Sequence, residues 1–286
     1  MKNRLLIAVF FTCWACLAVA QYGPEYPEPE DDERIYTALW WNPAESGWGL
    51  NTTHQGNILF ATLFTYAADG QPLWLVASSL AGDPYSAYSY SGPLYRTNGP
   101  AFHQVPWSPI GFAQVGNMNV AYQSPGTAVL TYTLDGVTVV KNVERQVYAA
   151  PVPMCIAFTG SRAAESNYQD LWWNPNESGW GINLVHQGTI IFATLFTYSE
   201  TGRDKWFVAS NLSRQADGAF TGPLYSTTGT AFNASPWQPI GFAQVGAMTL
   251  RFSDGERGML TYNVGATTVV KNIQRQVFGA VTSACR

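Results

Sequence analysis

After residue 35, the chain alternates hydrophobic and polar residues in short runs that end at glycine, proline or asparagine turns. β-Branched and aromatic residues with a period of two are typical of strands, and dipeptides such as Asp135-Gly136 are typical of the tight turns between them. No run keeps a helical period, so we predict an all-β fold. In the first half, the expected strands cover residues 48–54, 58–66, 72–80, 88–95, 116–122, 127–134 and 137–148.

This pattern occurs twice along the chain. Residues 39–78 and 171–210 agree at about 27 of 40 aligned positions, far above chance for this composition. The agreement continues through the Pro-Ile-Gly-Phe-Ala-Gln-Val-Gly of residues 109–116, which returns at 239–246. A repeat of roughly 110 to 120 residues has the size of a domain. We therefore predict a first module at residues 35–153, a linker at 154–169 and a second module at 170–286.

Seven or eight short consecutive strands joined by tight turns predict an antiparallel meander in each module. Closing the meander into an eight-stranded up-and-down barrel leaves no strand edge unpaired. We therefore expect two tandem barrels, with a two-sheet β-sandwich as the alternative. A single membrane barrel built from the whole chain is disfavoured, because each half repeats as a complete unit.

The amino terminus has the composition of a secretory signal. Lys2 and Arg4 precede an apolar run over residues 5–17, and Ala18-Val19-Ala20 forms a small-residue cleavage site. The run is shorter than the roughly 20 apolar residues that a membrane anchor needs, so we expect no transmembrane segment after cleavage. We predict a signal peptide at residues 1–20, an extended acidic, proline-rich leader at 21–34, and export to the periplasm or beyond.

Export changes the expected state of the cysteines. Cleavage removes Cys13 and Cys16 and leaves Cys155 and Cys285 in a compartment that permits oxidation. Two remaining thiols suggest one disulfide. Spacing alone leaves a second interpretation open, in which they are separate buried or reactive thiols.

The chain is poor in charge, with 12% charged and 47% hydrophobic residues and a net charge of −4. Loss of Lys2 and Arg4 with the signal leaves 13 basic against 19 acidic residues, a net charge of −6. The hydrophobic content excludes intrinsic disorder. A nucleic-acid partner is disfavoured as well, because phosphate binding needs a basic face.

Comparison of the two copies shows which side chains a module requires. Of the 11 tryptophans, the ten that follow the signal form five pairs: Trp40 with Trp172, Trp41 with Trp173, Trp48 with Trp180, Trp74 with Trp206 and Trp107 with Trp237. Most charged residues differ between the copies. The ionisable residues kept in both are Glu45 with Glu177, His54 with His186, Lys141 with Lys271 and Arg145 with Arg275.

These ionisable pairs do not form a recognisable catalytic or metal site. Glu45 precedes His54 by nine residues. An extended chain at about 3.3 Å per residue therefore places their side chains roughly 20 to 30 Å apart. Ser46, His54 and an acid fail as a triad for the same reason, and neither Asp69 nor Asp135 is duplicated. One histidine and one glutamate per module give too few metal ligands. We predict no catalytic residue, no metal and no cofactor.

Two cations share one face of the last strand of each module. Lys141 and Arg145 alternate with valines in the first copy, and Lys271 and Arg275 repeat the row in the second. An unpaired buried cation costs several kcal/mol, so an anion must meet them. We predict that Glu45 reaches Arg145 across its barrel and that the second copy forms the same pair. An anionic group of a ligand is the alternative, and Lys141 has the length to reach the barrel rim.

Strand alternation also places the aromatic residues. Trp48 shares a face with His54, so we expect Trp48 and Trp180 inside the barrels and the histidines near a mouth, hydrogen-bonded at a turn in preference to touching a ligand. Adjacent strand residues point to opposite faces, so one member of each tryptophan doublet leaves the core, for a contact surface or for an interface between modules. The predicted ligand-binding set is Trp40, Trp41, Glu45, Trp48, His54, Trp74, Trp172, Trp173, Glu177, Trp180, His186 and Trp206.

The string Trp-Trp-Asn-Pro-x-Glu-Ser-Gly-Trp-Gly, followed by His-Gln-Gly and Phe-Ala-Thr-Leu-Phe-Thr-Tyr, resembles a repeat of exported proteobacterial proteins. The likeness covers nearly all of residues 39–150 and 171–279. That repeat occurs alone, in tandem or appended to secreted enzymes, and it implies no catalytic residue. Appending one module to unrelated enzymes is typical of a binding or anchoring domain.

Aromatic rings stack on the apolar faces of sugars, while a few polar groups fix their orientation. We therefore expect a non-enzymatic binding module for a neutral or weakly anionic extracellular polymer, with carbohydrate as the leading class and two copies giving avidity. One alternative is a structural or assembly protein whose tryptophan-rich surface meets another protein. The other is a hydrolase with an unrecognised site.

Overall fold

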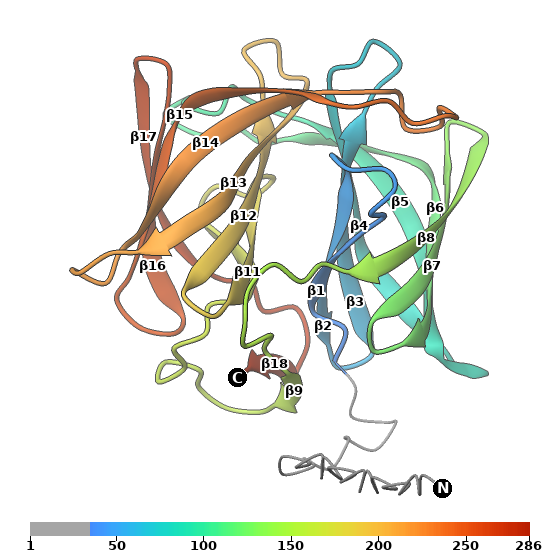
Figure 1. Ribbon diagram of the computed structural model, residues 1–286, viewed down its shortest axis with the longest axis horizontal. Helices are drawn as coiled ribbons and strands as arrows, with labels where there is room; N and C mark the ends of the chain where they lie inside the picture. Colours follow the sequence, from blue (N-terminus) through green and yellow to red (C-terminus); the bar gives the residue numbers. More distant parts are fainter. Residues whose placement is uncertain (1–34) are drawn as a thin grey trace, which may run out of the picture.

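Residues 35–286, which the computed structural model describes, form two closed antiparallel barrels and one small two-stranded sheet (Figure 1). All regular secondary structure in this part of the chain is β. The predicted signal and leader, residues 1–34, lie outside the described residues, and so do Cys13 and Cys16. The prediction of two tandem eight-stranded barrels is confirmed, and the sandwich alternative is wrong.

The first barrel is a meander in which each strand pairs with the next in the chain. Its strands are β1 (Ala38–Trp41), β2 (Gly49–Gln55), β3 (Ile58–Tyr66), β4 (Pro72–Asp83), β5 (Ser86–Asn98), β6 (Gly111–Ser124), β7 (Thr127–Leu134) and β8 (Val137–Arg145). β1 closes the barrel against β8, with Trp40 opposite Arg145. β1 was not predicted from alternation because four residues are too few to show a period.

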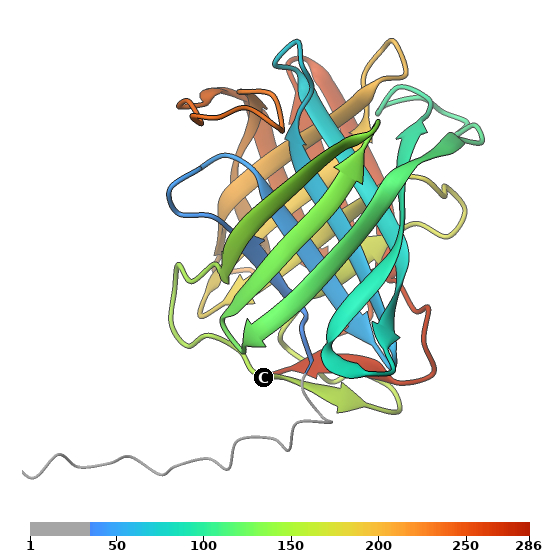
Figure 2. The same ribbon diagram turned by 90° about the vertical axis from the view of Figure 1, so that its right-hand side faces the viewer.

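The second barrel repeats this arrangement. Its strands are β10 (Asp170–Trp173), β11 (Gly181–Gln187), β12 (Ile190–Tyr198), β13 (Asp204–Arg214), β14 (Phe220–Thr228), β15 (Gly241–Phe252), β16 (Arg257–Val264) and β17 (Thr267–Arg275). β10 closes it against β17, with Trp172 opposite Arg275. The strands run obliquely around each barrel, as a view onto the first barrel shows (Figure 2), because a sheet closes only when its strands tilt.

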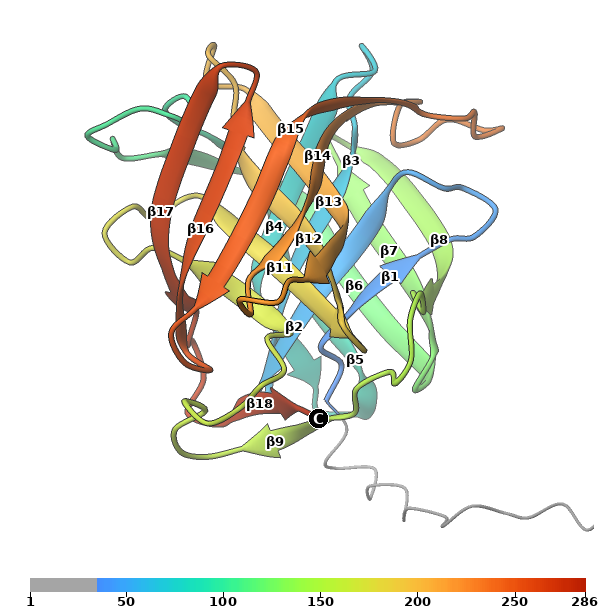
Figure 3. The ribbon, with the colours of Figure 1, turned by 60° about the vertical axis from the view of Figure 1, so that its left-hand side comes forward.

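The small sheet lies below the two barrels (Figures 1 and 3). It pairs β9 (Cys155–Phe158), from the predicted linker, with β18 (Thr282–Cys285) at the end of the described chain. A disulfide joins Cys155 to Cys285, which confirms the predicted bridge. The segment between the modules is therefore itself structured and is tied to the end of the second module.

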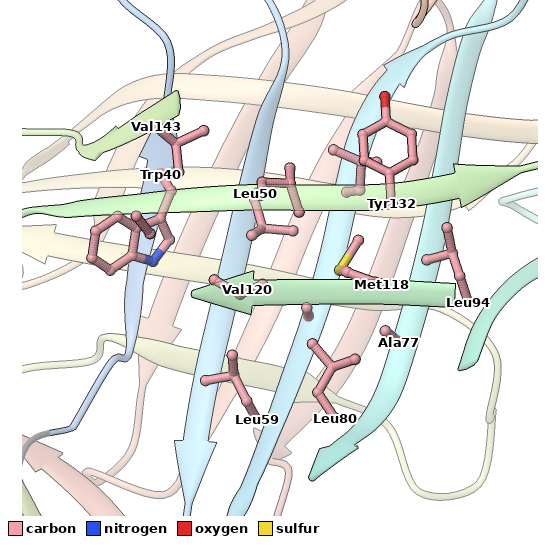
Figure 4. Close-up of a cluster of buried hydrophobic side chains, with 14 of the residues drawn as sticks. Trp40, Leu50, Leu59, Ala77, Leu80, Leu94, Met118, Val120, Tyr132 and Val143 are labelled. Atoms are coloured by element: carbon pink, nitrogen blue, oxygen red, sulfur yellow. The ribbon is translucent and has the colours of Figure 1, made fainter. Parts of the chain in front are cut away.

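Side chains fill the interior of each barrel. In the first barrel, Leu50, Leu59, Leu94 and Met118 point inward from four different strands (Figure 4) and are all buried. The second barrel has an equivalent core. A third cluster of buried residues lies between the barrels and consists of Leu39, Phe64, Tyr66, Trp74, Val185, Phe196, Tyr198 and Trp206. The two barrels therefore share one continuous apolar contact.

The barrels also exchange loops. The loop between β5 and β6 carries Phe102 into the core of the second barrel, where its backbone N–H donates to Tyr198 O at 3.1 Å. The loop between β14 and β15 runs across to the first barrel (Figures 1 and 3). There, Phe232 packs on that core and donates to Tyr66 O at 2.9 Å. Each barrel is thus completed by a loop of the other.

Candidate functional site

The contacts between the barrels are reciprocal. Trp74 Nε1 donates to Thr197 O at 2.9 Å, and its counterpart Trp206 donates to Thr65 O at 3.0 Å. Such paired contacts, in which each partner repeats what the other does, are those of a twofold interface. Trp74 and Trp206, predicted to bind ligand, are buried here with their indole N–H groups occupied, so they contribute ring surface and no free donor.

Two glutamines reinforce the same symmetry. Gln55 accepts from Phe278 N at 2.9 Å and donates to Gln276 O at 2.8 Å. Gln187 makes the matching bonds to Tyr148 N at 3.0 Å and Gln146 O at 2.9 Å. Every residue of β2 and β11 is buried as a result. The more polar face of these strands is covered by the neighbouring barrel, where the amides of Gln55 and Gln187 bond to backbone groups.

Two equivalent grooves open along the interface. Groove A has a volume of about 390 Å³ and groove B about 370 Å³, and each takes side chains from both barrels. The corresponding lining residues, groove A first, include Trp173 and Trp41, Phe112 and Phe242, Tyr95 and Tyr225, Thr97 and Thr227, Ser178 and Ser46, and Gln276 and Gln146. The internal repeat has therefore produced the same concave site twice, and both copies depend on residues of both modules.

The most exposed aromatic residues in the grooves are two phenylalanines. Phe112 is 73% exposed and Phe242 is 72% exposed. Each meets a tyrosine edge to face, Tyr95 at 6.1 Å and Tyr225 at 6.0 Å between ring centroids. An exposed large apolar side chain kept in both copies indicates a contact surface. This pair was not predicted, although the duplicated string at 109–116 contains Phe112, because the prediction rested on tryptophans and ionisable residues.

The structure separates the members of each tryptophan doublet. Trp40 and Trp172 are fully buried in the barrels, and they line neither groove, so they do not belong to the candidate site. Trp41 and Trp173 are partly exposed, and each lines a groove. One tryptophan of each doublet was expected either at a contact surface or between the modules. Trp41 and Trp173 meet both descriptions, because the grooves lie at the interface between the barrels. The indole Nε1 of Trp173 is buried without a hydrogen-bond partner among residues 35–286.

The glutamates pair with the lysines and not with the arginines. Lys141 Nζ lies 2.7 Å from Glu45 Oε2, and Lys271 Nζ lies 2.6 Å from Glu177 Oε2. The predicted partner Arg145 lies four residues further along β8, about 13 Å away at 3.3 Å per residue. This corrects the predicted Glu45–Arg145 and Glu177–Arg275 pairs: alternation identified the face of the strand but not the end that the glutamate reaches.

Each arginine is held at the other end of its strand. Arg145 donates to Pro153 O at 2.7 Å. Arg275 is buried and donates to Asp170 Oδ2 at 3.0 Å and to Asn167 O at 2.6 Å. Asp170 has no charged counterpart in the first module, where Ala38 takes its place. The arginines therefore anchor the segments that enter and leave the barrels, and neither lines a groove.

Each lysine sits in an aromatic cage built by both modules. Lys141 Nζ lies 5.9 Å from the ring centroid of Trp48 and 5.8 Å from that of Trp237, which comes from the exchanged loop. Lys271 repeats this with Trp180 at 5.7 Å and Trp107 at 5.0 Å. Such cation–π contacts stabilise a charge that is partly removed from water. Trp48 and Trp180 thus belong mainly to the cages, with one edge in a groove.

The exchanged loops dock on the Ser-Gly-Trp segment of the duplicated string. Trp237 Nε1 donates to Ser46 O at 3.0 Å, and Ile240 packs against Gly47. Gly47 has φ +108°, and a Cβ at this position would lie 2.4 Å from the Ile240 side chain. Only glycine fits both the backbone conformation and the close approach. The same contacts recur in the second barrel, which explains why this string is duplicated so closely.

The histidines lie inside the barrels and away from both grooves. His54 stacks on Tyr36 and contacts Tyr90 Oη through Nε2 at 3.1 Å. His186 stacks on Tyr168 and accepts its backbone N–H at 3.2 Å through Nδ1. Burial lowers the pKa of His186 to about 4, so it is neutral near pH 7. Both side chains have the hydrogen-bonded surroundings of structural residues.

Neither groove is lined by a charged side chain of the described chain; the polar groups are serine, threonine, tyrosine and glutamine side chains, indole N–H and backbone. Within residues 35–286, no three His, Cys, Asp or Glu residues gather where a metal ion could be held, and no helix is long and apolar enough to cross a membrane. No family model, curated protein or solved structure matches the chain.

Proposed function

We propose that the protein is an exported, non-enzymatic binding module that holds a neutral saccharide in each of its two inter-barrel grooves. The observation that supports this most is the duplicated pair of uncharged grooves with an exposed phenylalanine at each. Stacking on such rings suits the apolar face of a pyranose, and the surrounding hydroxyls and amides suit its edges.

The absence of charge from the described groove linings favours a neutral ligand over an anionic one. The lysines of the predicted anion site are already neutralised by Glu45 and Glu177. The uncharged hydroxyl and amide side chains of the lining, such as Tyr95, Ser178 and Gln276 in groove A, suit the hydroxyl groups of a sugar.

Assembly with another protein is the second candidate. It is favoured by exposed valines kept in both copies outside the grooves, Val140 with Val270 and Val147 with Val277. A partner protein would cover these together with the phenylalanines, whereas a saccharide confined to the grooves would leave the valines free. Hydrolysis ranks last, because the duplicated glutamates and histidines are engaged in the contacts described above.

Export and the relationship to the exported proteobacterial repeat are part of the same proposal. The disulfide between Cys155 and Cys285 supports an oxidising compartment. The docking role of the Ser-Gly-Trp segment gives a physical reason for a repeat that keeps this string.

The test is a glycan array that contains neutral and anionic cell-envelope polysaccharides. We expect binding to neutral glycans and a loss of roughly ten- to hundredfold in affinity for Phe112→Ala with Phe242→Ala, since burying each ring is worth about 1.5 to 3 kcal/mol. The matched control is Val140→Ala with Val270→Ala, which also removes exposed apolar groups, outside the grooves. No binding on the array would favour the protein partner, and glycan binding that only the valine variant loses would contradict a site in the grooves.

A further inference from the structure

The two grooves lie back to back. Groove A is lined on its inner side by Trp74 and Phe196, and groove B by Phe64 and Trp206. These four rings belong to the buried cluster between the barrels, and the centroids of Phe64 and Phe196 are 6.3 Å apart. A wall about two aromatic rings thick therefore separates the grooves.

The symmetry of the interface and the aromatic wall together place the grooves on opposite sides of the contact between the barrels. Sites related by a twofold axis lie on opposite sides of that axis, and the reciprocal Trp74 and Trp206 hydrogen bonds show that such an axis relates the barrels. Because the wall lies between them, a ligand that fills groove A extends away from groove B.

The barrels cannot swing to bring both openings to one side. Phe102 and Phe232 each insert into the opposite barrel, and Gln55 and Gln187 bind the backbone of the opposite module. The disulfide at Cys155 ties the segment between the modules to the end of the chain. Separating the barrels would expose the whole of the shared cluster, so the grooves keep their opposed directions.

We propose, resting on the proposed function, that one molecule bridges two neutral polysaccharide chains instead of binding one chain twice. Two linked sites give avidity on a single ligand only if that ligand spans both, and the gain vanishes when the geometry forbids it. A chain in groove A would have to turn around the molecule to enter groove B. A second chain enters directly, so a monomer with two sites cross-links its ligand. Avidity on one chain, the expectation from the sequence, would require a single ligand to reach both grooves.

The first arm of the test measures binding alone. The full chain is run by affinity electrophoresis through gels that contain dextran, pullulan, galactomannan or hydroxyethylcellulose. Retardation by at least one of these polymers supports saccharide binding. If none of the four polymers retards the protein, the bridging proposal is overturned and the proposed function is left without support.

The second arm measures bridging with the polymer that retards most. Light scattering follows the mass of the polymer as protein is added, and bridging predicts at least a twofold rise that reverses at excess protein, when every polymer site holds its own molecule. Phe112→Ala and Phe242→Ala, each affecting one groove, should still be retarded but should raise the mass little. Val140→Ala, the matched control, should behave as the unchanged protein does.

The two arms separate the two claims. Retardation without any growth in mass would overturn the bridging and leave saccharide binding intact. Growth that persists unchanged in both single-groove variants would also overturn it, because the cross-links would then not require both grooves. Growth that disappears in each single-groove variant and persists in Val140→Ala is the expected result.

Discussion

Asp204 is a half-buried carboxyl whose replacement by asparagine should stabilise the protein above neutral pH. It shares a cavity of about 350 Å³ with Arg96 and Arg203. Those arginines pair with other carboxylates, Arg96 with Asp135 at 3.0 Å and Arg203 with Asp69 at 2.9 Å. Asp204 Oδ1 is left without a hydrogen-bond partner among residues 35–286. Burial, only partly offset by the two arginines, raises the pKa of Asp204 to about 7.

The pKa sets both the sign and the size of the effect. An unfolded aspartate has a pKa of about 3.9, so between about pH 4 and pH 7 the folded chain holds a proton that the unfolded chain releases. The contribution of Asp204 to the free energy of unfolding therefore falls as the pH rises through this window. A shift of about three units corresponds to about 4 kcal/mol at pH 8, an upper bound for a side chain that keeps some contact with water. Asparagine is uncharged throughout and removes the loss.

Thermal unfolding of the unchanged protein and of Asp204→Asn at pH 4 and pH 8 measures this. We expect the variant to unfold several degrees higher at pH 8 and at nearly the same temperature at pH 4. Asp217→Asn is the control, because Asp217 is exposed and its hydrogen bond from Arg251 lowers its pKa, so its removal should not stabilise at pH 8. Equal or lower stability of Asp204→Asn at pH 8 would refute the reasoning.

Three further predictions follow from the contacts described. Protonation of His186 is opposed by burial, so the contribution of His186 to stability should fall by about 3 kcal/mol from about pH 6.5 to pH 4, opposite in sign to that of Asp204; urea unfolding should show this as a pH-dependent difference between the unchanged protein and His186→Gln. Trp107→Ala removes a wall of the Lys271 cage and should lower the free energy of unfolding by about 2 to 3 kcal/mol, whereas Val105→Ala, in the same loop and exposed, should change it little. Cys285→Ser should cost about 2 to 5 kcal/mol in chemical denaturation, and a reducing agent should then have no further effect.

Alternation and turn residues predict most of the fold because both report local geometry. Seven of the eight strands of the first barrel lie where the pattern places them, and the short β1 is the exception. Closure into a barrel also follows, since an open meander would leave two unpaired edges. The separation of Trp40 from Trp41 follows from the same rule, that neighbouring strand residues face opposite sides.

Long-range partners could not be predicted in the same way. Alternation puts Lys141 and Arg145 on one face, and only the position of the β1–β8 pairing shows that Glu45 reaches the first and not the second. Internal duplication adds a second ambiguity. When both modules carry the same residues, a contact such as Trp237 with Lys141 reads equally well as one within a module, so the sequence does not reveal that the loops are exchanged.

The grooves could not be predicted from the sequence for the same reason. Each combines side chains of two modules, so no single copy contains a complete site. Phe112 shows the point: within its own module it has only Tyr95 as a ring partner, and the groove appears once Trp173 of the other module lies opposite. The signal in the sequence is that Phe112 is repeated as Phe242, an aromatic residue that both modules keep.

The most direct test of the account counts the sites. Titration calorimetry with a short neutral oligosaccharide, cut from the polymer that retards the protein most, should give two equivalent sites on the unchanged chain. Phe112→Ala and Phe242→Ala should each leave one strong site, and the double variant none at the same concentration. A single site that neither substitution weakens would contradict the account.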